Sequence, residues 1–100
     1  DRLIESGLKI MLEVGTHDGL FNHHNVEFLH RVLFDHGIKH EYRTVLGANH
    51  VGQSMPDRMR AALSFLNVAL NPPPPDTAAD AFSAQMVEGM RAMGIEPPPF

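Results

Sequence analysis

The sequence predicts an α/β fold in which a crossover helix joins two parallel strands. Two short runs, residues 9–14 and 40–46, have the composition of strands. Between them, residues 25–36 repeat apolar side chains at helical spacing. Parallel strands need a crossover connection, which is usually a helix, so this order of patterns predicts a βαβ unit.

The first strand and the helix after it each end at a glycine. Residues 9–14 form an apolar run that stops at Gly15, as expected for a strand covered on both faces of a parallel sheet. In the helix over residues 25–36, Asn25 is the predicted N-cap and Gly37 the residue that ends the last turn. The apolar stripe of this helix consists of Val26, Phe28, Leu29, Val32, Leu33 and Phe34.

The second strand leads into a second helix. Residues 40–46 alternate and contain β-branched and aromatic side chains, which favour a strand. Residues 55–70 repeat apolar side chains every three or four positions, which predicts a closing helix. Ser54 is its predicted N-cap, and Pro56 suits its first turn.

A run of four prolines divides the sequence. The prolines at 72–75 end the second helix and predict a stiff extended linker. A short helix over residues 77–93 follows, and Gly94 and further prolines end it. We therefore expect residues 1–71 to form one α/β unit and residues 72–100 to form a linker with a helical tail.

Composition excludes several classes of protein. The 100 residues carry a net charge of −4 and no basic run, so nucleic acid is not an expected partner. The absence of cysteine excludes disulfides and thiolate metal sites within the chain. No apolar stretch approaches the roughly 18 residues of a membrane span, so no membrane partner is expected. Localisation and oligomeric state remain open.

Two titratable side chains follow the two predicted strands. Asp18 comes shortly after the first strand, and His50 comes shortly after the second. Loops at the carboxyl ends of neighbouring parallel strands meet at one edge of the sheet, where α/β proteins place their reactive groups. An aspartate that orients a histidine requires this arrangement. We therefore predict a hydrogen bond between Asp18 and the histidine, through Nδ1 of the ring.

These residues resemble the end of the α/β-hydrolase fold. The resemblance covers about residues 8–70 and rests on Gly-x-x-Asp at 15–18, Gly-x-x-His at 47–50, and the helices after each. The chain is similar in particular to the branch of this fold that contains esterase D-like, enterochelin-esterase-like and feruloyl-esterase-like enzymes. In that family the order is serine, acid, histidine, so the resemblance implies that Asp18 is the triad acid and His50 the triad base. It also implies a small-molecule ester as substrate and no cofactor.

The chain departs from that family in two ways. Residues 53–55 after the histidine are Gln-Ser-Met, whereas many of these esterases have an aromatic residue there. No Gly-x-Ser-x-Gly motif and no oxyanion-hole segment is present; the nearest match, residues 52–56, follows a histidine rather than a strand. Because large α/β enzymes need roughly 200 residues or more, we expect upstream sequence to contain the serine nucleophile.

Other interpretations of the same residues remain open. An aspartate in a glycine-flanked loop is commonly a turn former, and a loop histidine commonly bonds a backbone carbonyl. Leu20 and Phe21 are candidates either for an acyl pocket or for loop anchors. The chain has seven histidines, but no pair shows a Glu-flanked i, i+4 arrangement on a continuous helix, because Gly37 ends the helix between His36 and His40. No metal site is therefore predicted. The rival function is a non-catalytic α/β fragment or interaction module.

Overall fold

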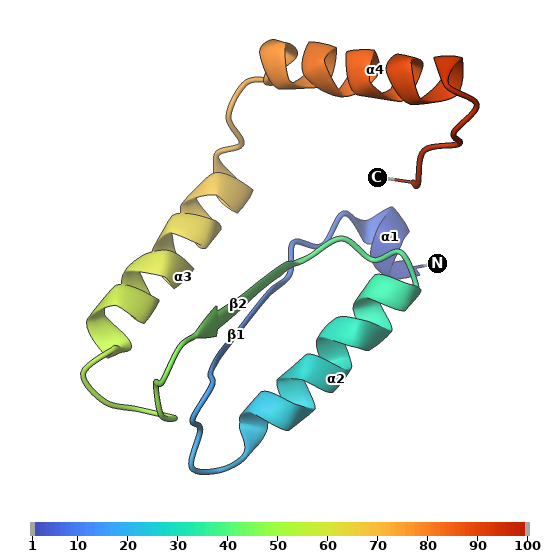
Figure 1. The fold of residues 1–100 in the computed structure, drawn as a ribbon. Coiled ribbons are helices and arrows are strands. Elements are labelled where there is room, and N and C mark those ends of the chain that lie inside the picture. Colours follow the sequence, from blue (N-terminus) through green and yellow to red (C-terminus); the bar gives the residue numbers. More distant parts are fainter. Residues whose placement is uncertain (1, 100) are drawn as a thin grey trace.

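The computed structural model describes residues 2–99 and has a mixed α/β fold, drawn in Figure 1. Four helices and two strands follow the order α1, β1, α2, β2, α3, α4. The helices are α1 (Arg2–Ser6), α2 (Asn22–Asp35), α3 (Met55–Leu70) and α4 (Thr77–Ala92), and the strands are β1 (Met11–Gly15) and β2 (Glu41–Val45). The short α1 has no counterpart among the predicted elements.

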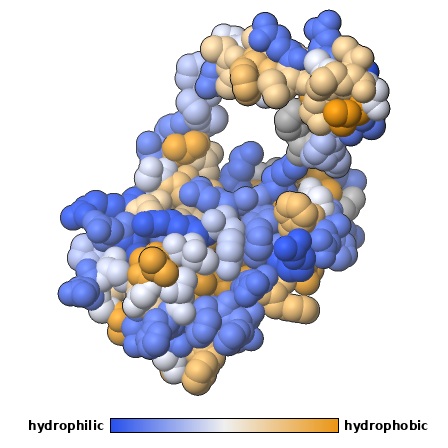
Figure 2. All heavy atoms as spheres, in the orientation of Figure 1, coloured by the Kyte–Doolittle hydropathy of each residue, from blue (hydrophilic) through white to orange (hydrophobic). Residues whose placement is uncertain are grey.

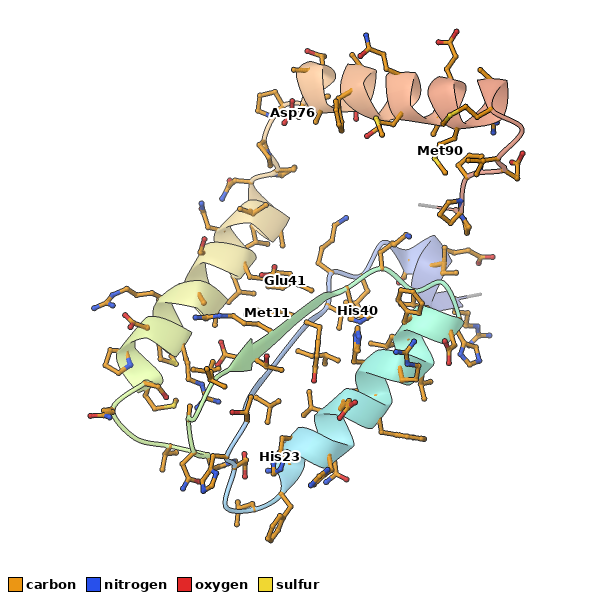
Figure 3. The ribbon with its side chains drawn as sticks, viewed as in Figure 1. Met11, His23, His40, Glu41, Asp76 and Met90 are labelled. Atoms are coloured by element: carbon orange, nitrogen blue, oxygen red, sulfur yellow. The ribbon has the colours of Figure 1, made fainter. Side chains whose placement is uncertain are left out.

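The two strands form one parallel sheet. Met11 lies opposite Glu41 at the start of the pair, where Figure 3 labels both, and Gly15 lies opposite Val45 at its end. The predicted parallel pairing is therefore confirmed. Each strand is slightly shorter than its predicted range, as expected for limits set by hydrogen bonding rather than by composition.

Helices α2 and α3 lie on opposite sides of the strands (Figure 1). Successive strand residues point to opposite faces of the sheet, so neighbouring side chains of β1 face different helices. Val14 is buried together with Leu33 of α2 and Ile38, and these three form the apolar core. Glu13 instead forms an ion pair with Arg58 of α3. The apolar core thus lies on the α2 side of the sheet, whereas an ion pair connects β1 to α3 on the other side.

The start of α2 differs from the prediction. Asn25 was the predicted N-cap, but the helix begins at Asn22 and Phe21 occupies the N-cap position. The cause is a turn after Asp18, whose carbonyl oxygen accepts the Phe21 N–H at 2.9 Å and directs the chain into a helix early. The predicted end is correct, because Gly37 has a φ of +68° just after the last turn.

Helix α3 has the predicted limits, but the side chain at its N-cap does not form the predicted hydrogen bond. Ser54 occupies the N-cap position, yet its side chain makes no capping hydrogen bond, so its predicted capping role is wrong. Its backbone is already helical, at φ −78° and ψ −11°, rather than in the extended conformation from which a serine hydroxyl caps a helix. Pro56 lies in the first turn, as predicted.

Helix α4 follows the proline run and extends away from the sheet (Figure 1). The side chain of Asp76 caps it by accepting the Ala79 N–H at 3.0 Å. Figure 2 shows apolar surface along this helix, which includes the exposed side chains of Phe82 and Met86. None of the helices within residues 2–99 combines the length and apolar character needed to cross a bilayer. The division into residues 1–71 and 72–100 stays a prediction.

Candidate active site

The loops after β1 and β2 are joined by backbone hydrogen bonds. Beyond the paired strand residues, the Thr16 N–H donates to the carbonyl of Val45 at 3.0 Å, and the His17 N–H donates to that of Ala48 at 2.9 Å. In return, the Gly47 N–H donates to Oγ1 of Thr16 at 2.7 Å. The two loops therefore leave the sheet as a connected pair at one edge.

Gly15 allows the two loops to approach this closely. A Cβ atom at this position would lie 2.2 Å from the carbonyl oxygen of Ala48 and 2.8 Å from that of Asn49. Both oxygens belong to the backbone, which cannot move aside as a flexible side chain can. Residue 15 must therefore lack a side chain for the second loop to cross the end of β1.

Asp18 and His50 form a hydrogen bond at this edge. Nδ1 of His50 lies 3.0 Å from Oδ2 of Asp18. The aspartate side chain is only 2% exposed, whereas the histidine side chain is 48% exposed. Nε2 of His50 makes no hydrogen bond to any of residues 2–99. The predicted contact is present, and it leaves the second ring nitrogen free to exchange a proton with a substrate or nucleophile.

The other carboxylate oxygen of Asp18 shapes the loop. Oδ1 accepts the Leu20 N–H at 2.7 Å, which is the turn expected of an aspartate between glycines. The turn-forming and histidine-orienting interpretations of Asp18 are therefore compatible, because the first uses Oδ1 and the second uses Oδ2. Burial alone raises the pKa of Asp18, but hydrogen bonds from His50 and the Leu20 and Asn22 backbone, with the charge of His50, hold that pKa below its usual range.

Asn49 joins the acid loop to the base loop through its side chain. Its Oδ1 accepts the Gly19 N–H at 2.8 Å and the His50 N–H at 2.7 Å. One amide oxygen thus holds the residue after the acid and the base itself. Asn49 was not among the predicted site residues, although its place directly before His50 could have indicated it.

A small cavity of about 260 Å³ opens beside Asp18. Phe21 belongs to its lining, whereas Leu20 does not, so of the two acyl-pocket candidates only Phe21 lies at a cavity. His23, labelled in Figure 3 at the start of α2, also lines it, and Nδ1 of this ring is buried without a hydrogen-bond partner. The complete lining is Thr16, His17, Asp18, Gly19, Phe21 and His23.

Three other histidines, His30, His36 and His40, form contacts of their own rather than with Asp18 or His50. Nδ1 of His30 lies 2.7 Å from Nε2 of His40, and the His30 ring stacks on Tyr42. His36 bonds the carbonyl of Val32 on its own helix. Within residues 2–99, no three side chains of histidine, aspartate or glutamate converge as metal ligands do.

No serine accompanies the pair among residues 2–99. Within the described residues, no serine hydroxyl makes a hydrogen bond with His50. The Ser6 hydroxyl donates to the Leu3 carbonyl in α1, and Ser64 and Ser83 lie within α3 and α4. The geometry therefore contains an acid and a base without the group that they would activate.

Comparison with known proteins found no matching family model, no matching curated protein and no matching solved structure. A functional assignment for this chain therefore depends on the geometry of Asp18, His50 and the residues around them.

Proposed function

We propose that this chain supplies the acid and the base of a carboxylic ester hydrolase of the serine, histidine, aspartate type. The observation that carries the proposal is the 3.0 Å hydrogen bond between Oδ2 of Asp18 and Nδ1 of His50. Both residues lie beyond the carboxyl ends of neighbouring parallel strands, in the chain order of the α/β-hydrolase resemblance. In this proposal the chain is the C-terminal part of such a fold, and the serine belongs to sequence upstream of residue 1.

The chemistry follows from the orientation of the imidazole ring. A proton on Nδ1 directed at Asp18 leaves Nε2 as the basic nitrogen. Nε2 takes the serine proton as the hydroxyl oxygen attacks the ester carbonyl, and then gives that proton to the departing alcohol. A water molecule then gives a proton to Nε2 as its oxygen attacks the acyl-serine ester, and Nε2 passes that proton to the serine oxygen as the carboxylic acid is released. Asp18 stays ionised and stabilises the imidazolium that forms in each step.

The ionisation state of Asp18 suits the role of a triad acid. Its lowered pKa keeps the carboxylate charged at neutral pH although the side chain is almost completely buried. A charged acceptor favours the tautomer with the proton on Nδ1, which is the tautomer that catalysis needs. The exposed position of the histidine ring leaves room for a nucleophile and a substrate on its other side.

The test uses the complete enzyme and a small aryl ester. We expect His50→Ala and Asp18→Asn each to lower kcat by a factor on the order of 10⁴, with the fold retained in circular dichroism. The matched controls are His36→Ala and Asp35→Asn, which change the same residue types at exposed positions on α2 and its end. Their rates should remain at the wild-type level. Near-wild-type activity of either triad variant contradicts the proposal.

The second candidate is a non-catalytic α/β module. Its support is that no serine within the described residues contacts His50. The two candidates differ in what lies upstream. A strand followed directly by Gly-x-Ser-x-Gly supports the hydrolase. An upstream region without this elbow, in a protein that turns over no ester, supports the module.

A further inference from the structure

Arg58 is a charged side chain that is almost completely removed from solvent. It lies near the start of α3, and its side chain is 10% exposed, compared with 73% for Arg60 two residues later. A guanidinium group stays charged when it is buried, so its burial is unfavourable unless the hydrogen-bond donors find partners. The hydrogen-bond partners of Arg58 therefore indicate which parts of the fold it holds together.

These partners lie on two sides of the guanidinium group. On one side, Nε donates to Oε1 of Glu13 at 2.5 Å. On the other, Nη1 donates to the carbonyl oxygen of Asn49 at 3.0 Å and, less closely, to that of His50 at 3.4 Å. One side of Arg58 thus reaches β1, and the other reaches the backbone of the proposed base.

Glu13 fixes the guanidinium group from the sheet. Its second carboxylate oxygen, Oε2, accepts a hydrogen bond from Arg43 of β2 at 3.1 Å. The glutamate, which belongs to β1, is therefore held by Arg43 of β2 as well as by Arg58 of α3. It lies only two residues before Gly15 in the strand that leads to Asp18. The contacts of Arg58 connect the strand that leads to the acid with the loop that carries the base.

We propose that Arg58 is a positioning residue for His50, an inference that rests on the proposed hydrolase function. By holding the two loop carbonyls, it fixes the backbone from which the imidazole extends and keeps Nδ1 directed at Asp18. The loop needs such a support because Gly52, two residues after the histidine, has a φ of +143°, a conformation that glycine adopts without restraint from a side chain.

The first measurement is made on the 100-residue chain and does not require activity. Exchange of the Nδ1 proton of His50 with water is followed by NMR in wild type, Arg58→Met and Arg58→Lys. Methionine keeps the apolar stem of arginine and removes the donors. We expect exchange to be roughly tenfold faster in Arg58→Met, the factor that one lost hydrogen bond gives. Lysine should have an intermediate effect, because its single ammonium group cannot span both partners.

Arg60→Met is the matched control. Arg60 lies on the same helix, but it is exposed and pairs with Asp57 rather than with the sheet or the loop. We expect wild-type exchange in this variant. In the complete enzyme, Arg58→Met should lower kcat on the order of tenfold with little change in KM, and Arg58→Lys should recover part of the loss.

The outcomes separate this inference from the hydrolase proposal. A folded Arg58→Met chain with wild-type exchange overturns the positioning role. If Arg58→Met does not fold, Arg58→Lys decides in its place, because lysine keeps a positive charge beside Glu13 but lacks the several donors of the guanidinium group. Wild-type exchange in Arg58→Lys then overturns the positioning role. If the complete enzyme turns over no ester, the hydrolase proposal fails, while the exchange measurement still decides whether Arg58 holds His50.

Discussion

Nδ1 of His50 and Oδ2 of Asp18 lie 3.0 Å apart although the two residues are separated by 32 positions in the chain. The contact forms because parallel neighbouring strands end at one edge and because the loops after them are joined by backbone hydrogen bonds. A charged carboxylate at this position favours the tautomer with the proton on Nδ1, and the hydrogen bond lowers the pKa of the buried Asp18 carboxyl. Nε2 of His50 makes no hydrogen bond within residues 2–99.

The stability of the fold should depend on pH through Asp18. The folded-state pKa of this carboxyl lies below its usual range, so the unfolded chain binds the proton more readily than the folded chain. Stability from this group is fully present above the ordinary aspartate pKa and is lost as pH falls through that value toward the lower folded pKa. Urea unfolding at a series of pH values measures this, and Asp18→Asn should show a weaker dependence over that range. Equal acid dependence in both proteins contradicts the prediction.

Asp18 should titrate differently when its partner is removed. Hydrogen bonding and charge from His50 both lower the pKa of this carboxyl. In His50→Ala we therefore expect an NMR titration of the aspartate carboxyl to give a higher pKa than in wild type. His36→Ala serves as the control, because His36 bonds Val32 on its own helix. An unchanged Asp18 titration in His50→Ala shows that the two side chains do not interact in solution.

Gly15→Ala should destabilise the sheet edge. The added methyl group would collide with the Ala48 carbonyl oxygen, and relief requires the second loop to move away. We expect a loss of about 1–3 kcal/mol in the free energy of unfolding, measured in urea. The control is Gly89→Ala, which meets no atom within 4 Å and lies inside α4, where alanine favours the helix. A Gly15→Ala chain as stable as wild type means that the loops do not approach as described.

Removal of residues 72–100 should leave the rest of the protein intact. The prolines separate α4 from α3, and no buried residue lies beyond Leu70 among the described positions. We expect the truncated chain to unfold with a free energy within about 0.5 kcal/mol of wild type, as for changes at a surface. In the complete form of the proposed hydrolase, kcat on a small ester should stay at the wild-type level. Collapse of folding or of activity after truncation assigns the tail a structural role.

The order of elements and the place of the site were predictable from local patterns. Apolar runs, helical spacing and a proline run depend on neighbours in sequence, so they located β1, β2, α3 and α4 to within a few residues. The same local reasoning failed at the start of α2, because the turn that begins it depends on hydrogen bonds to Asp18 rather than on Asn25. It also failed for Ser54, whose hydroxyl makes no capping hydrogen bond.

By itself, the sequence determined that two strands would be parallel and that Asp18 and His50 would follow them at one edge. Only the tertiary structure decided that Asn49 joins the two loops and that Arg58 is buried between Glu13 and the histidine backbone. The reason is physical. Strand and helix patterns arise from interactions over a few residues, whereas these hydrogen bonds depend on the register of the sheet and on the face that α3 covers, which no local spacing specifies.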